Sequence, residues 1–441
     1  MADYAHGFTI DAQRCAGRLA CMRACPTQAI RVKSGKARLR PELCIDCGLC
    51  LRVCPSGAIR ATTRSYSDLD RFKYKVAVPS PVLFGQFPSE ITPGHIAAGL
   101  RGIGFDAVWD FGVEVVLAGM AIRDYVESWK GPYPLISISC PVVVRLVQVL
   151  YPDMIGQLIP IQPPRELAGR ELKRRYSEEL GIDPAEIAAV YITPCQAKTI
   201  SILQPAEGAA SNLEGALGIS DVYNDILTLI RAPGKGQEHA APDDFVCNAE
   251  TLRWCIDQGQ GRVLPHHRRM TVTGLSNVIQ VFDDIEKGKL RNIEYLECDA
   301  CWGGCISGNL TVDNVYVTLS KIRHLLAQSP DPRPQMEAEV QRRYPNEVFS
   351  LEGRVTPRVV EEPMRGLKER VKRIKTGKTV VKTLPGLDCG LCGAPTCQAF
   401  AKDVAAGTAR QGECVFFSSK RLKHLRRTYL RGEKRRPNRE P

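Results

Sequence analysis

Alternating strand-like and helix-like segments run through the middle of this chain. Short apolar runs, about as long as buried strands, begin near residue 75 and recur as far as residue 296. Longer segments with a helical period of apolar positions separate them. The predicted strands are 75–79, 107–111, 135–139, 187–192 and 293–296, and the predicted helices are 93–103, 113–129, 142–151, 167–180, 221–231 and 278–287. This alternation predicts an α/β domain with parallel sheets and helices over residues 62–327.

The two ends of the chain depart from this pattern. Residues 1–61 contain only short segments and predict a small α+β domain. Residues 328–375 are charged and rich in proline, which predicts a helical linker. Residues 376–419 predict a second small domain, which is helical, and residues 420–441 a basic tail. The fold class is therefore an α/β central domain with a small domain on either side.

Three loops of the central domain carry cysteine. Each follows a predicted strand, and each cysteine has proline or glycine nearby. The four cysteines are Cys140, Cys195, Cys301 and Cys305. Because ligands of parallel sheets lie at the carboxyl ends of strands, these thiols can meet and hold one buried iron–sulfur cubane. The alternative is a set of unrelated buried cysteines, since free cysteine is among the most buried residue types.

Residues 1–61 contain a repeated run of cysteines. The second run is a complete C-x2-C-x2-C-x3-C-P pattern, which is typical of two-cluster ferredoxins, and its fourth cysteine ligates the other cluster. The crossed rule predicts one complete cluster, on Cys25, Cys44, Cys47 and Cys50. The other cluster has only Cys15, Cys21 and Cys54. A zinc site fits poorly, because the two runs exceed the four ligands that zinc needs.

Arg18 occupies the position where the first run should have its second cysteine. Arginine stays protonated and cannot ligate iron as a neutral donor. Three contents of this site stay open: a three-iron cluster, a four-iron cluster with an outside ligand, or a labile or empty site.

A third group of cysteines lies near the end of the chain. Its C-x2-C-x4-C-x16-C pattern comprises Cys389, Cys392, Cys397 and Cys414. The pattern resembles the small [4Fe-4S] domain of electron-transfer subunits and corrinoid proteins. Zinc is the alternative metal for four such thiolates.

Composition adds the compartment and limits the partners. Fifteen of the 18 cysteines fall in these groups, and Cys247, Cys255 and Cys298 are predicted to be core residues. So many apparent metal ligands favour a reducing compartment, and we expect a cytoplasmic protein. No run of about 18 apolar residues predicts a membrane span. The formal charge of +12 omits the negative charge of ligating thiolates. The basic tail has no interleaved aromatic residues, so nucleic-acid binding is not expected.

The three loops of the central domain resemble the signature loops of the [FeFe]-hydrogenase large-subunit domain, over roughly residues 70–327. In that family four cysteines hold a [4Fe-4S] cubane, and one of them bridges to a two-iron subsite that carries CO and cyanide. The resemblance implies that Cys305 is the bridging ligand and that Lys198 contacts a cyanide.

The same resemblance reveals departures at the positions that move protons. Ser139 stands where the family has a proton-passing cysteine. Counted back without gaps, the two relay glutamates of the family fall on Gly119 and Ile122. Thr193 and Asp299 replace methionines that pack against the two-iron unit. The ligands are retained, whereas fast proton delivery is lost.

The loop after Ile138 is similar to the sensory branch of this family, which also carries the C-terminal cluster domain. We therefore expect a protein that senses hydrogen or redox state with slow or no turnover, uses three to four [4Fe-4S] clusters, and acts on a separate signalling or redox partner. Hydrogenase maturation proteins would supply the two-iron unit. One alternative is a multi-cluster electron-transfer protein without that unit. A weaker one is an active hydrogenase that uses Ser139 or a water chain.

Overall fold

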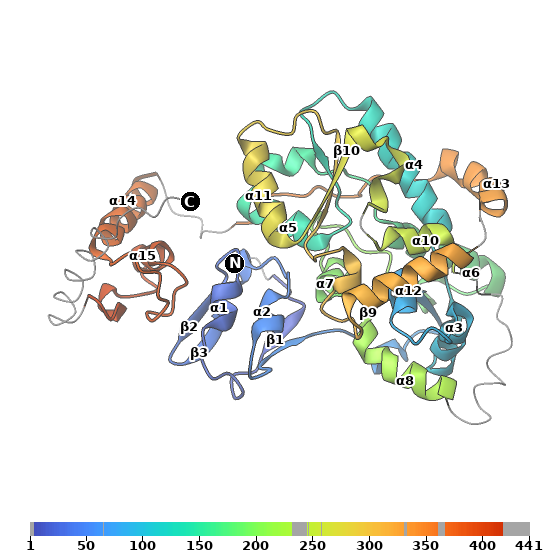
Figure 1. Ribbon diagram of the computed structural model, residues 1–441, viewed down its shortest axis with the longest axis horizontal. Helices are drawn as coiled ribbons and strands as arrows, with labels where there is room; N and C mark the ends of the chain where they lie inside the picture. Colours follow the sequence, from blue (N-terminus) through green and yellow to red (C-terminus); the bar gives the residue numbers. More distant parts are fainter. Residues whose placement is uncertain are drawn as a thin grey trace.

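The computed structural model describes residues 4–64, 66–231, 245, 247–256, 258–329, 333–359 and 367–417. Figure 1 shows three bodies in a row, with the N-terminal segment between the large central domain and the helices α14 and α15 of the C-terminal segment. The basic tail, 420–441, lies outside the described residues. No helix in the described ranges is long and apolar enough to cross a membrane.

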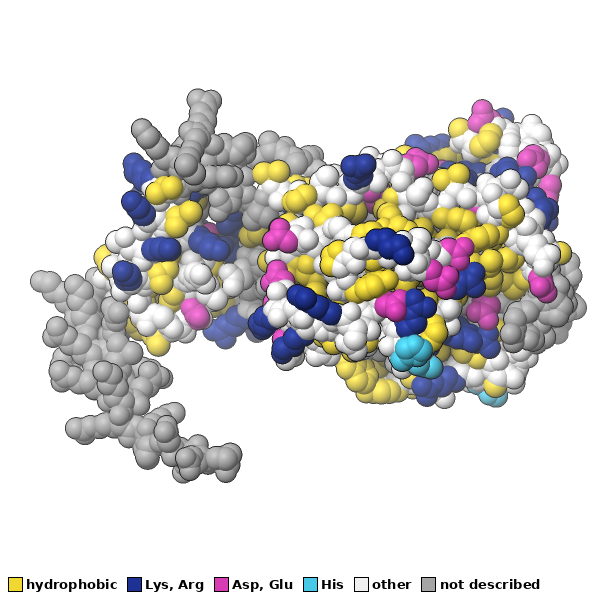
Figure 2. All heavy atoms as spheres, turned by 90° about the horizontal axis from the view of Figure 1, so that it is seen from above, with side chains coloured by type: hydrophobic (Ala, Val, Ile, Leu, Met, Phe, Trp, Pro, Cys, Tyr) yellow, Lys and Arg dark blue, Asp and Glu magenta, His cyan; other side chains and the backbone are white. Residues whose placement is uncertain are grey.

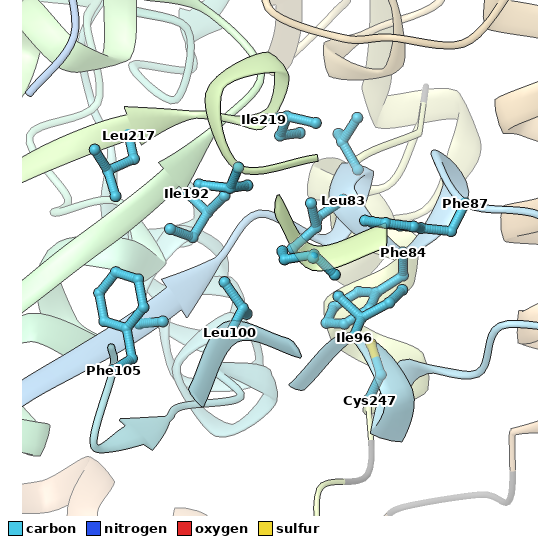
Figure 3. Close-up of a cluster of buried hydrophobic side chains, with 14 of the residues drawn as sticks. Leu83, Phe84, Phe87, Ile96, Leu100, Phe105, Ile192, Leu217, Ile219 and Cys247 are labelled. Atoms are coloured by element: carbon cyan, nitrogen blue, oxygen red, sulfur yellow. The ribbon is translucent and has the colours of Figure 1, made fainter. Parts of the chain in front are cut away.

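The central domain contains two parallel sheets, which confirms the predicted α/β fold. The first sheet has the order β6-β5-β8-β9. Its strands are β5 (Tyr74–Pro79), β6 (Ala107–Val108), β8 (Ile187–Thr193) and β9 (Gly215–Gly218). Its interior strand β8 is buried along its whole length. Figure 3 shows the core on one side of this sheet, where Ile192 and Leu217 face Leu100 and Phe105.

The second sheet has the order β10-β11-β7 and is also parallel. Its strands are β7 (Leu135–Ile136), β10 (Arg269–Thr273) and β11 (Tyr295–Asp299). The strand predicted at 293–296 is thus shifted toward the third cysteine loop, because all of β10 pairs with β11. Strands β9 and β10 were not predicted from the sequence. Strand β9 is four residues long and reads Gly-Ala-Leu-Gly, which is a weak strand signal.

Helices cover both sheets, and most of them match the predicted segments within a few residues. Their ends follow local rules: Thr92 caps the first of them, and Gly181 ends α6 with a left-handed backbone. The central helices are α3 (Pro93–Gly102), α4 (Gly112–Ser128), α5 (Pro141–Leu150), α6 (Pro164–Leu180), α7 (Gln196–Leu203), α8 (Ile219–Arg231), α10 (Ala249–Trp254), α11 (Leu275–Glu286) and α12 (Val315–Gln328).

The N-terminal domain shows the internal repeat in three dimensions. Each half has a short helix followed by a strand, namely α1 (Ala20–Ala24) with β2 (Ile30–Lys33) and α2 (Leu49–Val53) with β4 (Ile59–Ala61). Strand β1 (Phe8–Ile10) pairs with β4, and β2 pairs with β3 (Lys36–Leu39), both antiparallel. The core is small and consists largely of the cluster-type cysteines and a few apolar side chains.

Helix α13 (Arg333–Arg343) lies beside α4 of the central domain. The segment that follows it packs around a second small core. Helix α14 (Leu367–Thr383) begins inside the range predicted as linker, and Val380 at its end packs with α15 (Cys397–Ala405).

The loop before α2 joins the N-terminal domain to the central domain through buried polar contacts. Asp46 is fully buried and pairs with Arg145 of α5 and with His6. Gln196 donates to the Asp46 carbonyl at 2.7 Å, and Asn309 donates to the Cys47 carbonyl at 3.2 Å. Because these contacts reach the cluster-type loop itself, they fix its position against the central cysteine loops.

Gly48 lies at a tight contact between the N-terminal domain and the central domain. Gly48→Ala should therefore destabilise the protein. The φ of Gly48 is +74°, and an added Cβ would lie 1.8 Å from Asn309 Nδ2 and 2.5 Å from Gln196 Nε2. Gly57 is a matched control, with φ +59° and open space around its Cα. Gly57→Ala should cost about 1 kcal/mol of unfolding free energy from backbone strain. Gly48→Ala should cost about 1–3 kcal/mol more, because its neighbours must move. Anaerobic denaturant unfolding measures both, and equal losses would contradict the tight contact.

Candidate iron–sulfur sites and the central cavity

The four central cysteines meet where the two sheets end. Cys195 directly follows β8 of the first sheet, whereas Cys301 follows β11 and Cys140 follows β7 of the second sheet. Burial raises the pKa of the Cys301 thiol, and the charges of Cys195, Cys140 and Cys305 raise it further. The four sulfurs are therefore close enough to interact, as the sequence predicted. Bound iron would reverse this effect by holding the thiols deprotonated.

Two helix N-termini point their free amides at this group. Cys140 is the N-cap of α5, and Cys195 is the N-cap of α7. The positive end of a helix dipole stabilises negative charge, so both helices favour thiolates and an anionic cluster. Gly303 and Gly304 adopt φ of +76° and +87°, which lets the third loop curl around the same point.

Lys198 supplies a buried positive charge next to these thiols. Its Nζ lies 3.0 Å from Cys305 Sγ. Burial alone would lower the pKa of Lys198, but the charges of Cys305 and Cys195 raise it well above its usual value. The lysine therefore stays charged where it sits.

A cavity opens beside Cys305 and brings together three of the residues singled out in the sequence. Ser139, Lys198 and Cys305 all line it. Its other walls include Pro163, Pro164, Trp254 and Tyr191, together with the buried side chain of Arg165. Two buried cations, the Cys305 thiol and prolines give a lining that fits a small anionic metal unit.

Arg165 was not singled out from the sequence. Its Nη2 donates to Ser201 Oγ at 3.2 Å, and its Nε faces Glu166 at 3.5 Å without forming a hydrogen bond in the described part of the chain. The side chain therefore retains donor capacity at the cavity. No local motif marks this arginine, because it reaches the site only through the packing of α6.

Cys255 was predicted to be a core residue, and it is buried, as are Cys247 and Cys298. The structure adds that Cys255 lines the same cavity as Cys305. Its thiol donates to the Leu252 carbonyl at 3.2 Å. Burial, followed by the charge of Cys305, raises its pKa. Its spacing from the other cysteines carries no signal, so the sequence could not place it here.

The positions of the family's relay glutamates are apolar in three dimensions as well. Ile122 lines a smaller cavity that also touches Ser139, and a Cβ on Gly119 would lie 2.8 Å from a methyl of Val263. Both residues are on α4 and buried. Asp299 is buried at the end of β11. Burial raises the pKa of Cys140, and the charge of Asp299 raises it further.

Most electrostatic contacts among the N-terminal cysteines fall within the two groups that the crossed rule predicts. Burial raises the pKa of Cys21, and the charges of Cys15 and Cys54 raise it further. Burial likewise raises the pKa of Cys47, and the charge of Cys25 raises it further. The charges that act on Cys44 include Cys47 and Cys25, and those on Cys50 include the same pair together with Cys21 of the other group.

Backbone amides in both groups donate to sulfur, as expected around bound clusters. The amides of Ala37 and Ala29 point at Cys15 and Cys25 from 3.3 and 3.2 Å. The amide of Asp46 points at Cys44 from 3.4 Å. Such bonds stabilise thiolate and tune cluster potentials.

His6 and Asp46 lie close to Cys44 and could form a three-ligand group with it. Asp46 already pairs with Arg145, and Cys44 belongs to the complete cluster set, so this group is part of that set's surroundings. Burial opposes ionisation of Asp46, but His6 and Arg145 outweigh it and lower its pKa.

Arg18 lies at the edge of the incomplete set. It is exposed, and it lines one cavity with Cys15, Cys21 and Cys54. The space next to the three thiols thus opens toward solvent at the position of the missing ligand.

The C-terminal cysteines also gather at one place. Cys392, Cys397 and Cys414 pack in the same small core. Burial raises the pKa of Cys392, and the charges of Cys414 and Cys389 raise it further. The amide of Cys397 is held by Asp388 at 2.6 Å. The four thiols therefore lie close to one another, and their binding of a cluster stays a prediction.

Family models match all three parts of the chain. Residues 73–214 match the family model of the iron only hydrogenase large subunit, C-terminal domain. Residues 8–55 match a 4Fe-4S dicluster domain, and residues 384–416 match a family described as an Fe-S cluster.

Curated relatives include iron hydrogenase 1 of Clostridium pasteurianum, which is 24% identical over 49% of this chain and 45% of its own length. The periplasmic [Fe] hydrogenase large subunit of Nitratidesulfovibrio vulgaris is 28% identical over 46% of this chain and 53% of its own length. A cytosolic Fe-S cluster assembly factor NAR1 homolog of Schizosaccharomyces japonicus is 32% identical over 18% of this chain and 16% of its own length. The chain thus spans about half the length of the first two.

Among solved structures, a variant of the [FeFe]-hydrogenase HydA1 from Chlamydomonas reinhardtii is 18% identical. The match covers 67% of this chain and 96% of that one, with a TM-score of 0.48.

The open edge at Arg18 generates a prediction about iron content. Arg18→Cys supplies the missing fourth thiolate, so iron per chain should rise and the cluster spectrum should change. Iron analysis and electron paramagnetic resonance (EPR) of anaerobically reconstituted protein measure this. Arg14→Cys, on an exposed neighbouring side chain, is the control and should change neither. An unchanged iron count and spectrum in Arg18→Cys would show that the site is already complete.

Proposed function

Because the central part of this chain, residues 73–214, belongs to the iron-only ([FeFe]) hydrogenase large-subunit family, we propose that the protein senses hydrogen or redox state with slow or no turnover. The coarser statement, a hydrogenase-like iron–sulfur protein, rests on the family matches in all three parts. The observation that carries the finer proposal is the single cavity lined by Ser139, Lys198 and Cys305.

The residues of this cavity have separable roles in the proposal. Cys140, Cys195, Cys301 and Cys305 would hold a [4Fe-4S] cubane, and Cys305 would also help to hold a two-iron subsite. When bound, that subsite would supply the iron at which hydrogen binds. Lys198 and Arg165 then hold its anionic ligands by charge-assisted hydrogen bonds.

The groups that would deliver protons quickly are absent from the expected positions. Ser139 reaches the cavity, but a hydroxyl exchanges protons far more slowly near neutral pH than a thiol. Behind it lie Ile122 and Gly119 instead of carboxylates. A site that binds the gas without fast proton exchange is better suited to report its presence than to turn it over.

The remaining clusters connect this site to a partner. We propose clusters on the complete N-terminal set and on Cys389, Cys392, Cys397 and Cys414, with the Arg18 set as a fourth, incomplete site. The partner is a separate redox or signalling protein, and hydrogenase maturation proteins supply the two-iron unit. A reducing compartment such as the cytoplasm suits so many iron-ligating thiols.

One observation favours a second candidate, an electron-transfer protein that never receives the two-iron unit. Lys198 already has a partner in Cys305, so its positive charge has a use next to a cubane alone. The partial likeness to a NAR1 homolog, a cytosolic Fe-S cluster assembly factor, is compatible with a hydrogenase-like protein of this second kind.

An infrared spectrum decides between the two. The full chain is purified anaerobically after coexpression with hydrogenase maturation factors, and the CO and cyanide stretching region is recorded before and after hydrogen is added. Bands that shift under hydrogen are the expected result. Lys198→Gln should move the cyanide bands, whereas Lys173→Gln, on a lysine of α6 that pairs with Glu214, should not. Cubane signals without any such bands would favour the electron-transfer protein.

Ser139→Cys tests the loss of proton delivery. A thiol at this position restores one relay group, so hydrogen turnover should rise by about 10²-fold or more, since general acid–base catalysis typically contributes 10²–10⁴-fold. Ser128→Cys, on an exposed serine at the end of α4, is the control and should give no gain. An already fast wild type, with little change in Ser139→Cys, would instead identify an active hydrogenase.

A further inference from the structure

The C-terminal domain is docked on the N-terminal domain through its own cysteine loop. The amide of Val32, in β2, donates to the carbonyl of Gly393 at 2.9 Å. Arg23, in α1, donates to the carbonyl of Cys389 at 3.2 Å. The contact therefore joins the ligand loop of one cluster site to elements that surround another.

A buried ion pair fixes this contact. Arg31 binds Asp403 of α15 through two nitrogens, at 2.5 and 3.1 Å, and their side chains are only 8% and 6% exposed. Arg40 adds a second contact to Asp403 at 3.3 Å, and Lys33 pairs with Glu413 at the rim. A buried ion pair adds little to net stability, but separating its two partners leaves an unpaired buried charge and is costly in free energy. The pair therefore favours a single docked arrangement.

Two glycines allow the loops to touch. A Cβ on Gly393 would lie 1.9 Å from the carbonyl oxygen of Val32, and one on Gly390 would lie 2.8 Å from Met22 Cε. Val32 and Leu19 touch these glycines and also line the cavity that holds Arg18 and its three cysteines. The C-terminal set thus lies against the Arg18 set.

The opposite side of the N-terminal domain bears the complete set, whose loop contacts Gln196 and Asn309 of the central domain. These contacts point to the spatial order C-terminal set, Arg18 set, complete set and central set. Figure 1 shows the same row of domains. Figure 2 shows basic side chains gathered on the left-hand lobe, which the small domains form.

We propose that the C-terminal domain is a docked electron-transfer module that communicates with the central site only through the Arg18 site. This rests on the clusters of the proposed function, but not on the two-iron unit. The content of the Arg18 site then determines whether the terminal cluster is connected to the rest of the chain. A loss of iron there isolates the terminal cluster while leaving the complete set and the central set joined.

The first test separates docking from cluster loading. In the full chain, with Arg18→Cys as background so that the inner site is complete, we compare Gly393→Ala with Gly407→Ala. Gly407 has φ +76° in the same domain and nothing within 4 Å of an added Cβ, so it controls for backbone strain. Iron per chain should be the same in both. The EPR spectrum of the fully reduced control should show broadening from spin coupling between the two neighbouring clusters.

Gly393→Ala should remove that broadening, as should Cys392→Ser, which removes the terminal cluster itself. After one-electron photoreduction, the electron should spread along the chain about tenfold more slowly, or slower still, in Gly393→Ala. The added Cβ overlaps a backbone oxygen, which should lower the equilibrium constant for docking by at least the same factor. Equal coupling and equal rates at equal iron content in the two alanine variants would overturn the proposal.

A second variant keeps the test decisive if Gly393→Ala loses iron. Asp403→Ala leaves Arg31 buried without its partner and should undock the domain, whereas Lys402→Ala removes an exposed neighbouring charge and should not. Wild-type chains with an iron-depleted Arg18 site should behave like the undocked variant. If they equilibrate as fast as Arg18→Cys, the terminal cluster has another route and the proposal is wrong. Chains without any cluster would instead refute the proposed function, and iron analysis reports that separately.

Discussion

The burial of several cysteine thiols at one point, where iron would hold them deprotonated, is the constraint on which the rest of this structure depends. Negative charge is costly in a protein interior unless donors and cations surround it. Here the N-termini of α5 and α7 and the ammonium of Lys198 face the four central cysteines. Strand ends and helix starts alternate along one edge of a parallel sheet. Cysteine loops that follow parallel strands therefore lie where such donors meet.

Much of this arrangement could be predicted from sequence because its signals are local. Strand and helix periods indicated the α/β central domain, and fixed spacings indicated the N-terminal and C-terminal cysteine sets. The crossed pairing of Cys25 with the second run followed from a known pattern and agrees with the charges that act on Cys47. Cys255 and Arg165 reach the cavity only through tertiary packing, and no spacing announces them. The contacts of Asp46 and Asp403 join residues about 100 and more than 350 positions apart, which one sequence cannot reveal.

The cavity beside Cys305 combines two features with opposite implications. Its cations and the Cys305 thiol suit a small anionic metal unit, yet the positions expected to pass protons carry a hydroxyl and an aliphatic group, and the Cys255 thiol reaches the cavity from another helix. Binding depends on charge and shape, whereas turnover also needs groups whose pKa lies near the working pH. Residues of the first kind are present and those of the second kind are lost at the expected positions. That separation is the physical reason to place sensing ahead of catalysis.

Both faces of the N-terminal domain are held in the same way, and this suggests what its contacts are for. On each face a buried aspartate pairs with an arginine of the other domain, Asp46 with Arg145 and Asp403 with Arg31. On each face a glycine with positive φ lets a cysteine loop approach its neighbour, Gly48 on one side and Gly393 on the other. Apolar packing of the same area would bind as well or better, but it tolerates sliding, whereas a buried ion pair accepts one geometry. The rate of electron exchange between two clusters depends on the distance between them. Contacts that fix the positions of the domains, even if they bind them less strongly, therefore suit a chain whose small domains connect one cluster site to the next.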